Sequence, residues 1–401
     1  MDLKEYVELD KNYLLQVFSK PDLVIEKGDG VYLYDISGNK YLDFVSGIAV
    51  NLFGHNDKGL KEVIRNQIDK LIHVSNLYHN IPQIELAKLL VDNTIKSGKV
   101  FFTNSGTESN EGAIKFARIY SIKRKGALAY KIVAAKNSFH GRTFGSLSIT
   151  GQPKFWKNLG PTMENVEFIE YGSIEDLERV IDKNTAALFL EPLQAEGGIN
   201  EADISFWKKV KQVCEENDCL LVLDEVQTGL CRTGPLFGYK DLMIEPDIIT
   251  LAKGLGHGIP LGAIIIKDKV AEYIDKGMHG STLGGNPLAC SVGNYVLNRL
   301  IDDGFENKVR KIGNFFKEEL NKLKEKHPDK IEKVKGKGLI LGLKLKNENI
   351  SSIIDLLREN YNILITRAGV DVLRFLPPLI IEKSHIEYLV NSLNEVLGSR
   401  T

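Results

Sequence analysis

The middle of the chain is built from short apolar runs, and this pattern restricts the fold more than any other feature of the sequence. Each run is four or five residues long and is separated from the next by a turn or by helical sequence such as 205–217. Strands that are apolar throughout are buried on both faces, as in a parallel sheet covered by helices. The sequence therefore predicts an α/β fold with a mostly parallel sheet, whose strands include residues 99–103, 131–135, 187–190, 220–223, 247–251 and 263–266.

The two ends of the chain follow other patterns. Apolar alternation around Ser37-Gly38-Asn39 predicts a β-hairpin. Helical spacing of apolar residues recurs elsewhere, and an apolar run lies at 338–343; the helical stretches are 57–92, 287–327, 351–360 and 384–397. A chain of 401 residues exceeds the size of a single core. We expect an N-terminal segment (1–55) packing with a smaller α+β domain (286–401), and a large domain (56–285) between them.

Composition limits the classes of partner. Lys and Arg number 52 and Asp and Glu 53, and this balance argues against nucleic-acid binding, which favours an excess of basic residues. No apolar run reaches the roughly 18 residues that span a membrane, and the first residues lack the apolar core of a signal peptide. The four cysteines predict free thiols rather than disulfides, and no metal site is expected. These features predict a cytoplasmic protein without a membrane partner.

Ligands of parallel α/β sheets bind at the carboxyl ends of the strands, so the residues that follow each strand are the candidates for chemistry. After 99–103 comes Asn104-Ser-Gly-Thr-Glu-Ser-Asn-Glu111, which opens a helix; Ser105 and Glu108 have the spacing of a capping box. Gly106 permits close approach of a ligand to the free N–H groups of the first turn, which suit an anion. An ordinary capped helix would have the same sequence.

The next strand ends carry an aromatic ring and charged groups. Phe139 and Arg142 lie on a loop with Gly141 and suit stacking and carboxylate binding, although a surface loop is an equal alternative. Asp224 directly follows an apolar run, and a buried carboxylate needs a partner. Lys253 ends another run among small residues, where desolvation would lower the pKa of its amine and favour a Schiff base; a Lys that reaches solvent is the simpler alternative.

Together these groups indicate one cofactor. A phosphate cradle, an aromatic plate, a buried Asp and a sheltered Lys are what pyridoxal 5'-phosphate requires. The glycines at 336, 338 and 342 are spaced one residue too far apart for a dinucleotide fingerprint and do not open a helix.

Eight motifs resemble those of the class III pyridoxal-phosphate aminotransferases, and the resemblance covers nearly the whole chain. Within that family the motifs are most similar to those of enzymes that act on N-acetylornithine. They are Tyr41-Leu-Asp-Phe-Val-Ser-Gly-Ile-Ala-Val-Asn51, Ser105-Gly-Thr-Glu-Ser-Asn-Glu111, Phe139-His-Gly-Arg-Thr143, Glu191-Pro-Leu-Gln-Ala-Glu-Gly-Gly198, Leu223-Asp-Glu-Val-Gln-Thr-Gly229, Leu251-Ala-Lys-Gly-Leu-Gly256, His279-Gly-Ser-Thr-Leu-Gly-Gly-Asn-Pro287 and Arg374-Phe-Leu-Pro-Pro378. The resemblance implies the fold type I of aminotransferases and a homodimer whose active site is shared across the interface.

The resemblance also implies a role for each matching residue. Lys253 and Asp224 are the catalytic pair; the cofactor-binding set is Ser105, Gly106, Thr107, Phe139, Asp224, Val226, Gln227, Lys253 and Thr282, the last from the neighbouring subunit; the substrate-binding set is Arg142, Ser281, Glu196 and Arg374. The sequence departs from the family at Ser109, Ala195 and His257, and the last leaves the shape of its loop open.

The implied reaction moves the terminal amino group of N-acetylornithine to 2-oxoglutarate. Aminotransferases acting on succinyl-diaminopimelate, ornithine or 4-aminobutyrate are alternatives on the same fold, and a glutamate-semialdehyde aminomutase is a further one. A relative that serves only as a binding protein would be expected to lack Lys253 or Asp224, and both are present.

Overall fold

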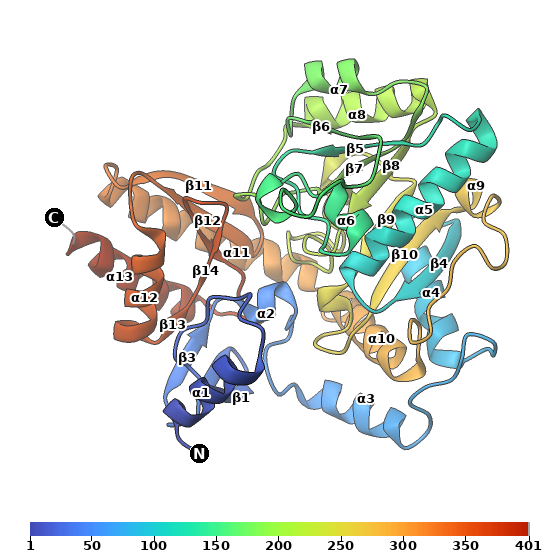
Figure 1. The fold of residues 1–401 in the computed structure, drawn as a ribbon. Coiled ribbons are helices and arrows are strands. Elements are labelled where there is room, and N and C mark those ends of the chain that lie inside the picture. Colours follow the sequence, from blue (N-terminus) through green and yellow to red (C-terminus); the bar gives the residue numbers. More distant parts are fainter. Residues whose placement is uncertain (400–401) are drawn as a thin grey trace.

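A seven-stranded sheet forms the centre of the larger body of the molecule (Figure 1). The computed structural model describes residues 1–399. The strands follow the order β4-β10-β9-β8-β7-β5-β6 across the sheet. Their bounds are β4 Gly98–Thr103, β5 Lys131–Ala135, β6 Val166–Ile169, β7 Thr185–Leu190, β8 Leu220–Asp224, β9 Ile248–Leu251 and β10 Gly262–Lys267.

The six predicted strands are confirmed, and the sheet is mostly parallel. Every residue of β7, β8 and β9 is buried, which explains their unbroken apolar sequences. β10 is the exception in direction, because it runs antiparallel to both of its neighbours. β10 therefore begins at the edge of the sheet where the other strands end. β6 was not predicted from the sequence; it is an edge strand that alternates between more and less exposed residues.

Helices cover this sheet. α5 (Gly106–Lys125) packs across β7, β9 and β10, while α7 (Ile174–Val180) packs with α8 (Ile204–Asn217) beside β6 and β8 (Figure 1). Shorter elements are α6 (Phe144–Ser148), α9 (Asp268–Ala271), η1 (Pro153–Phe155), η2 (Gly238–Leu242) and η3 (Lys253–Leu255).

The start of α5 forms only half of the predicted capping box. Ser105 Oγ accepts a hydrogen bond from Glu108 N at 3.3 Å, as expected. The Glu108 carboxylate instead accepts from Asn104, at its backbone N (2.9 Å) and its Nδ2 (2.8 Å). The reciprocal bond is therefore made one residue before the N-cap, and it fixes the residue that follows β4.

The N-terminal part forms a small sheet that includes a strand from the C-terminal part. The predicted hairpin is confirmed as the antiparallel pair β2–β3, to which β1 adds a third strand. β3 then pairs in parallel with β13, through Leu42 and Ile363. The bounds are α1 Leu3–Tyr13, β1 Ile25–Asp29, β2 Tyr32–Asp35, β3 Lys40–Asp43, α2 Ser46–Ala49 and β13 Ile363–Leu364.

The C-terminal part contains a second four-stranded sheet with the order β11-β12-β15-β14, and all its pairs are antiparallel. Figure 1 shows this sheet and its helices on one side of the molecule and the large sheet on the other. The predicted helices near 351–360 and 384–397 are confirmed. The bounds are β11 Ile331–Lys337, β12 Ile340–Leu345, α12 Ile350–Tyr361, β14 Thr366–Ala368, β15 Val372–Phe375 and α13 Lys383–Gly398.

Two long helical stretches of the sequence are each divided. The stretch at 57–92 is α3 (Lys58–Ile68) and α4 (Ile81–Asn93), because Asn80 caps a new helix with Pro82 in its first turn. The stretch at 287–327 is α10 (Pro287–Asp302) and α11 (Phe305–Lys326), separated at Gly304, whose φ is +64°. α10 packs against α3 and α4, whereas α11 packs against β11 and α13. The division of the chain into domains at residues 55 and 285 stays a prediction.

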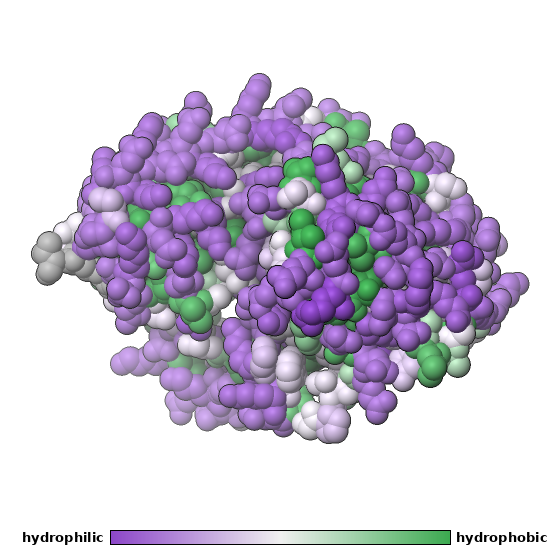
Figure 2. All heavy atoms as spheres, turned by 90° about the horizontal axis from the view of Figure 1, so that it is seen from above, coloured by the Kyte–Doolittle hydropathy of each residue, from purple (hydrophilic) through white to green (hydrophobic). Residues whose placement is uncertain are grey.

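The face of the molecule seen in Figure 2 is mainly hydrophilic, with apolar atoms visible in separate patches. All four cysteines are buried and unpaired, as predicted. Among the helices within residues 1–399, none combines the length and the apolar character that crossing a membrane requires.

Candidate active site

A cavity of about 420 Å³ opens at the edge of the large sheet where β4, β5, β7, β8 and β9 end and β10 begins. Segments from all six strand ends contribute to its walls. The predicted site residues that line it are Ser105, Gly106, Thr107, Phe139, Arg142, Asp224, Val226, Gln227 and Lys253. The fold thus brings together residues that are up to 148 positions apart in the sequence.

The N-terminus of α5 forms one wall. Its first N–H groups have no acceptor within the helix, as at any helix N-terminus, and they favour an anion. A Cβ on Gly106 would lie 2.8 Å from Val226 Cγ1, so only glycine fits between the cavity and that side chain. Thr107 Oγ1 accepts hydrogen bonds from the backbone N of Arg142 and of Thr143, both at 3.1 Å.

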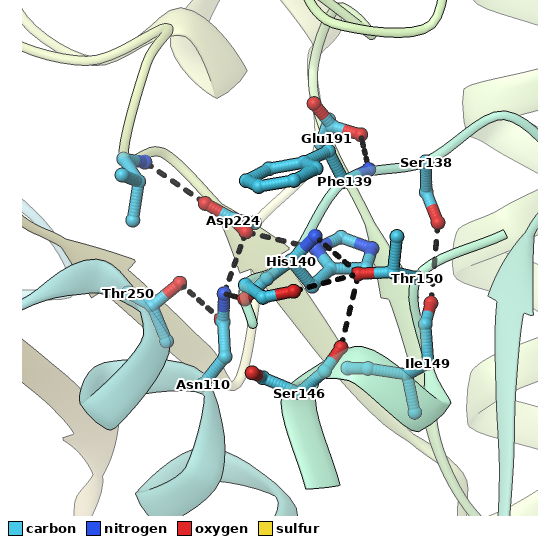
Figure 3. Close-up of polar contacts among 12 residues, drawn as sticks. Asn110, Ser138, Phe139, His140, Ser146, Ile149, Thr150, Glu191, Asp224 and Thr250 are labelled. Atoms are coloured by element: carbon cyan, nitrogen blue, oxygen red, sulfur yellow. Dashed lines mark hydrogen bonds and ion pairs between the residues drawn. The ribbon is translucent and has the colours of Figure 1, made fainter. Parts of the chain in front are cut away.

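Asp224, the last residue of β8, is buried and held by three donors. Its Oδ2 accepts from Asn110 Nδ2 and from His140 Nδ1, both at 2.8 Å, and its Oδ1 accepts from Val226 N at 3.0 Å. Figure 3 shows the two side chains converging on the carboxylate. Thr250 Oγ1 donates to Asn110 Oδ1 at 2.9 Å and so fixes which way the amide points. The carboxylate therefore has a fixed orientation beside the cavity.

The sequence patterns gave Asn110 and His140 no role as partners of Asp224. Asn110 lies on the second turn of α5, and His140 is buried in the loop after β5. The only sequence signal was their occurrence within the motifs that follow β4 and β5. Glu191, another strand-end residue, is also buried, and its Oε1 accepts from Phe139 N at 3.0 Å. Burial, and next the charge of Asp224, raise the pKa of Glu191 well above its usual value.

Lys253 is the first residue of η3 and has a left-handed backbone, with φ of +46°. Within residues 1–399 no group forms a hydrogen bond or a short ion pair with its Nζ. Burial lowers the pKa of Lys253 below its usual value, and the nearby carboxylate of Glu196 partly opposes this effect. A larger fraction of the amine is therefore neutral than for a lysine in water, as a nucleophile or a base requires.

A cluster of polar side chains lies where β15 meets the segments that follow β7 and β8. It consists of Glu196, Gln227 and Arg374. Arg374, on β15, is 2% exposed, and its Nη1 donates to Glu196 Oε1 at 2.6 Å and to Gln227 Oε1 at 3.4 Å. Gln227 Nε2 also donates to Glu196 Oε1, at 3.2 Å. Burial alone would raise the pKa of Glu196, but the charges of Arg374 and Lys253 outweigh it and lower this pKa to about 2.

The last two predicted residues lie away from this cavity. Ser281 Oγ accepts hydrogen bonds from Gly284 N at 2.9 Å and from Asn104 Nδ2 at 3.4 Å, so it touches a residue of the wall. Thr282 is exposed and does not line the cavity of its own subunit.

The three departures from the family pattern fit their surroundings. Ala195 is fully buried, and Ser109 Oγ donates to the carbonyl of Leu251 at 3.0 Å. His257 is buried and has φ of +45°. Its Nε2 accepts from Phe53 N at 2.9 Å, and its ring stacks on the Phe53 ring at 5.2 Å. His257 thus connects the loop of Lys253 to the N-terminal segment.

These residues fit pyridoxal 5'-phosphate. The gap kept open by Gly106 leads to helix N–H groups for a phosphate, Asp224 supplies a buried negative charge for a ring nitrogen, and Lys253 supplies an amine of lowered pKa. Phe139 adds an aromatic wall to the same cavity.

Comparisons with known proteins agree with that chemistry. The chain is 46% identical to the acetylornithine aminotransferase of Caldanaerobacter subterraneus subsp. tengcongensis, over 98% of this chain and 99% of the relative. It is 46% identical to that of Aquifex aeolicus, over 96% and 100%. The crystal structure of an ornithine aminotransferase from Toxoplasma gondii is similar, with a TM-score of 0.95, 29% identity, and coverage of 100% of this chain and 96% of that one. Residues 16–397 match the family model for aminotransferase class-III. The chain is therefore a pyridoxal-phosphate-dependent enzyme of the class-III aminotransferase family.

Proposed function

We propose that this enzyme transfers the terminal amino group of N-acetylornithine to 2-oxoglutarate, giving N-acetylglutamate semialdehyde and glutamate, a reaction of arginine biosynthesis. The observation that carries the proposal is the Glu196–Arg374 pair, which lies beside a cavity that also contains Arg142. The relatives named as acetylornithine aminotransferases, 46% identical to this chain, supply the identity of the donor.

The chemistry is divided between cofactor and protein. Bound pyridoxal phosphate supplies the carbonyl that accepts the amino group and a ring that takes up the electrons released from the substrate carbon. Lys253 Nζ takes the proton from the carbon that bears the amine, for which its lowered pKa suits it. Asp224 would supply a negative charge for the ring nitrogen, and the N-terminus of α5 at Gly106 and Thr107 would bind the phosphate. Phe139, Val226 and Gln227, which line the same cavity, would hold the ring.

Two arginines suit two substrates with different numbers of carboxylates. N-acetylornithine has one carboxylate, distant from the reacting amine, and we assign it to Arg142 with Ser281 nearby. Glutamate has a second carboxylate next to its amine, and we assign that one to Arg374. Glu196 neutralises Arg374 while the first substrate is bound, because a buried guanidinium without a partner costs about 3–5 kcal/mol. When glutamate binds, its second carboxylate becomes the partner of Arg374, and Glu196 has to move away.

We further propose a homodimer in which Thr282 of the partner subunit completes the phosphate site. Thr282 is exposed, and its neighbour Leu283 is 54% exposed. Asn76 Nδ2 donates to the carbonyls of Ser281 and Gly284, both at 3.0 Å, and so joins this loop to a segment where Leu77 is 84% exposed. Such an apolar surface is typical of a protein interface.

Free cysteines are usual in the cytoplasm, where we expect the enzyme to act.

A comparison of amino donors tests the proposed function. The holoenzyme is mixed separately with N-acetylornithine, ornithine, 4-aminobutyrate and succinyl-diaminopimelate, and the rate of the first half-reaction is followed by the absorbance of the cofactor. The highest kcat/KM is expected for N-acetylornithine. The Lys253→Ala variant is the control and should react with none of the four. A higher kcat/KM for any other donor would replace the proposed substrate.

A further inference from the structure

The main chain around Arg142 is held against α5. The backbone N of Arg142 and of Thr143 donate to Thr107 Oγ1 at 3.1 Å. Thr143 Oγ1 in turn donates to Glu111 Oε1 at 2.5 Å. Gly141 has φ of +135°, and a Cβ there would lie 2.3 Å from Thr107 Oγ1. Because the backbone is fixed, the direction of the Arg142 guanidinium depends on what its side chain touches.

Among the residues that the structure describes, the side chain of Arg142 touches an aromatic ring and no acid. Its guanidinium carbon lies 3.7 Å from the ring centroid of Phe155, the last residue of η1, and 5.6 Å from that of Phe139. Within residues 1–399 no carboxylate lies within 4.0 Å of Arg142. A guanidinium 3.7 Å above a ring is well inside the range of a cation–π contact.

This environment matters for a residue that binds a carboxylate. An acidic neighbour would also hold Arg142, but it would compete with the substrate for the same N–H donors. A ring contacts the face of the guanidinium and leaves the donors at its edge free. Phe155 also packs edge-on against Phe139, with ring centroids 6.1 Å apart and planes at 85°. The Phe155 ring is therefore itself held in place by a residue of the cavity wall.

We infer that Phe155 is a positioning residue, whose ring holds the guanidinium of Arg142 ready for the substrate carboxylate farthest from the reacting amine. The inference rests on the proposed function, in which Arg142 binds that carboxylate. Phe155 thereby favours donors and acceptors that carry a distant carboxylate over those that lack one.

The test compares Phe155→Leu with Phe155→Tyr, which keeps the ring. Two donors are used: N-acetylornithine and N-acetyl-1,4-diaminobutane, which is the same molecule without the carboxylate. Phe155→Leu is expected to raise KM for N-acetylornithine about 2- to 5-fold, the range of an exposed cation–π contact, with kcat changed less than about twofold. It should leave kcat/KM for the carboxylate-free donor unchanged, and Phe155→Tyr should restore the KM of the unaltered enzyme.

The matched control is Phe144→Leu, because Phe144 is 58% exposed and does not line the cavity. The melting temperature and the visible spectrum of the bound cofactor are recorded for every variant, since a change in either would reveal an effect through Phe139. A Phe155→Leu enzyme that loses the same factor with both donors, or with neither, would overturn the inference.

A binding measurement separates this inference from the proposed function. Glutarate, a dicarboxylate without an amine, is titrated into each holoenzyme by calorimetry. Its Kd should rise about 2- to 5-fold in Phe155→Leu and stay constant in Phe155→Tyr and Phe144→Leu. This result would hold whichever amine proves to be the donor, and an unchanged Kd in Phe155→Leu would contradict the role of Phe155 alone.

Discussion

At the scale of single residues, Asp224 shows what a sequence can and cannot reveal. The residue stood out because it directly follows an apolar strand, and a carboxylate in that place needs donors. Its donors Asn110 and His140 lie 114 and 84 residues away, on a helix and on a loop. Only the assembly of β4, β5 and β8 into one sheet brings them together, so no local pattern predicts that contact. For the same reason, the contact between Phe155 and Arg142 could not be predicted from local patterns.

The Glu196–Arg374 pair leads to a prediction on substrate choice. Removing the carboxylate in Glu196→Ala leaves Arg374 free to attract the second carboxylate of glutamate at all times. We expect the ratio of kcat/KM for N-acetylornithine to that for glutamate to fall about tenfold, equivalent to about 1.4 kcal/mol. This is less than the cost for a fully buried pair, because Glu196 is 25% exposed.

Glu196→Gln, which keeps the shape without the charge, should lower the ratio to a similar extent. Since the pKa of Glu196 is about 2, its carboxylate stays ionised as the pH falls to about 3, and the ratio in the unaltered enzyme should be flat between pH 6 and 8. Unchanged ratios in both variants would mean that the pair does not discriminate between the two amines.

At the scale of elements, strong local patterns were reliable and interrupted ones were not. The buried strands β7, β8 and β9 were found because burial on both faces leaves few polar positions. β6 and β11 were missed, since their partly exposed faces admit polar residues. The break between α10 and α11 was not predicted, because helical spacing of apolar residues continues on both sides of Gly304. The helix ends there because Gly304 has a left-handed backbone, with φ of +64°.

His257 provides a prediction on stability at the level of one loop. Burial lowers its pKa to about 4, whereas a histidine in the unfolded chain has a pKa of about 6.5. Between these values the unfolded chain binds a proton that the folded protein refuses, so the stability falls as the pH is lowered from 6.5 towards 4. From pH 7.5 to 5.0 this one group removes about 2 kcal/mol.

The His257→Gln variant should therefore lose less free energy of unfolding over that pH range than the unaltered protein, by about 2 kcal/mol. Denaturant unfolding at both pH values measures the difference, and all other titrating groups cancel because they are common to both proteins. Equal losses in the two proteins would show that His257 accepts a proton in the folded state.

At the scale of the whole molecule, the site depends on two bodies and, as we propose, on two subunits. Arg374 comes from the smaller antiparallel sheet, whereas Glu196 and Gln227 follow strands of the large sheet. Neither strand periodicity nor motif spacing relates these sheets to each other. The resemblance to a family was needed to put Arg374 and Glu196 in one substrate-binding set, and in the structure their side chains form an ion pair.

Mixing two defective variants tests whether the site is shared. Lys253→Ala removes the reacting amine, and Thr282→Arg blocks the contact with a neighbouring phosphate site. Unfolding and refolding the two together should produce mixed dimers with one site in which Lys253 and Thr282 are both intact. Activity should recover to about a quarter of that of the unaltered enzyme, because half of the dimers are mixed and each has one working site.

Each variant refolded alone provides the baseline, and size measurement by ultracentrifugation reports the assembly. No gain of activity on mixing would show that Thr282 serves its own subunit or none.

The parallel pairing of β3 with β13 has a consequence for how the protein is made. Leu42 and Ile363 are neighbours in one sheet, yet more than 300 residues separate them along the chain. Pairing over such a separation is slow, and during synthesis the earlier strand leaves the ribosome long before its partner exists. The small sheet that contains the hairpin can therefore be completed only when translation is nearly finished.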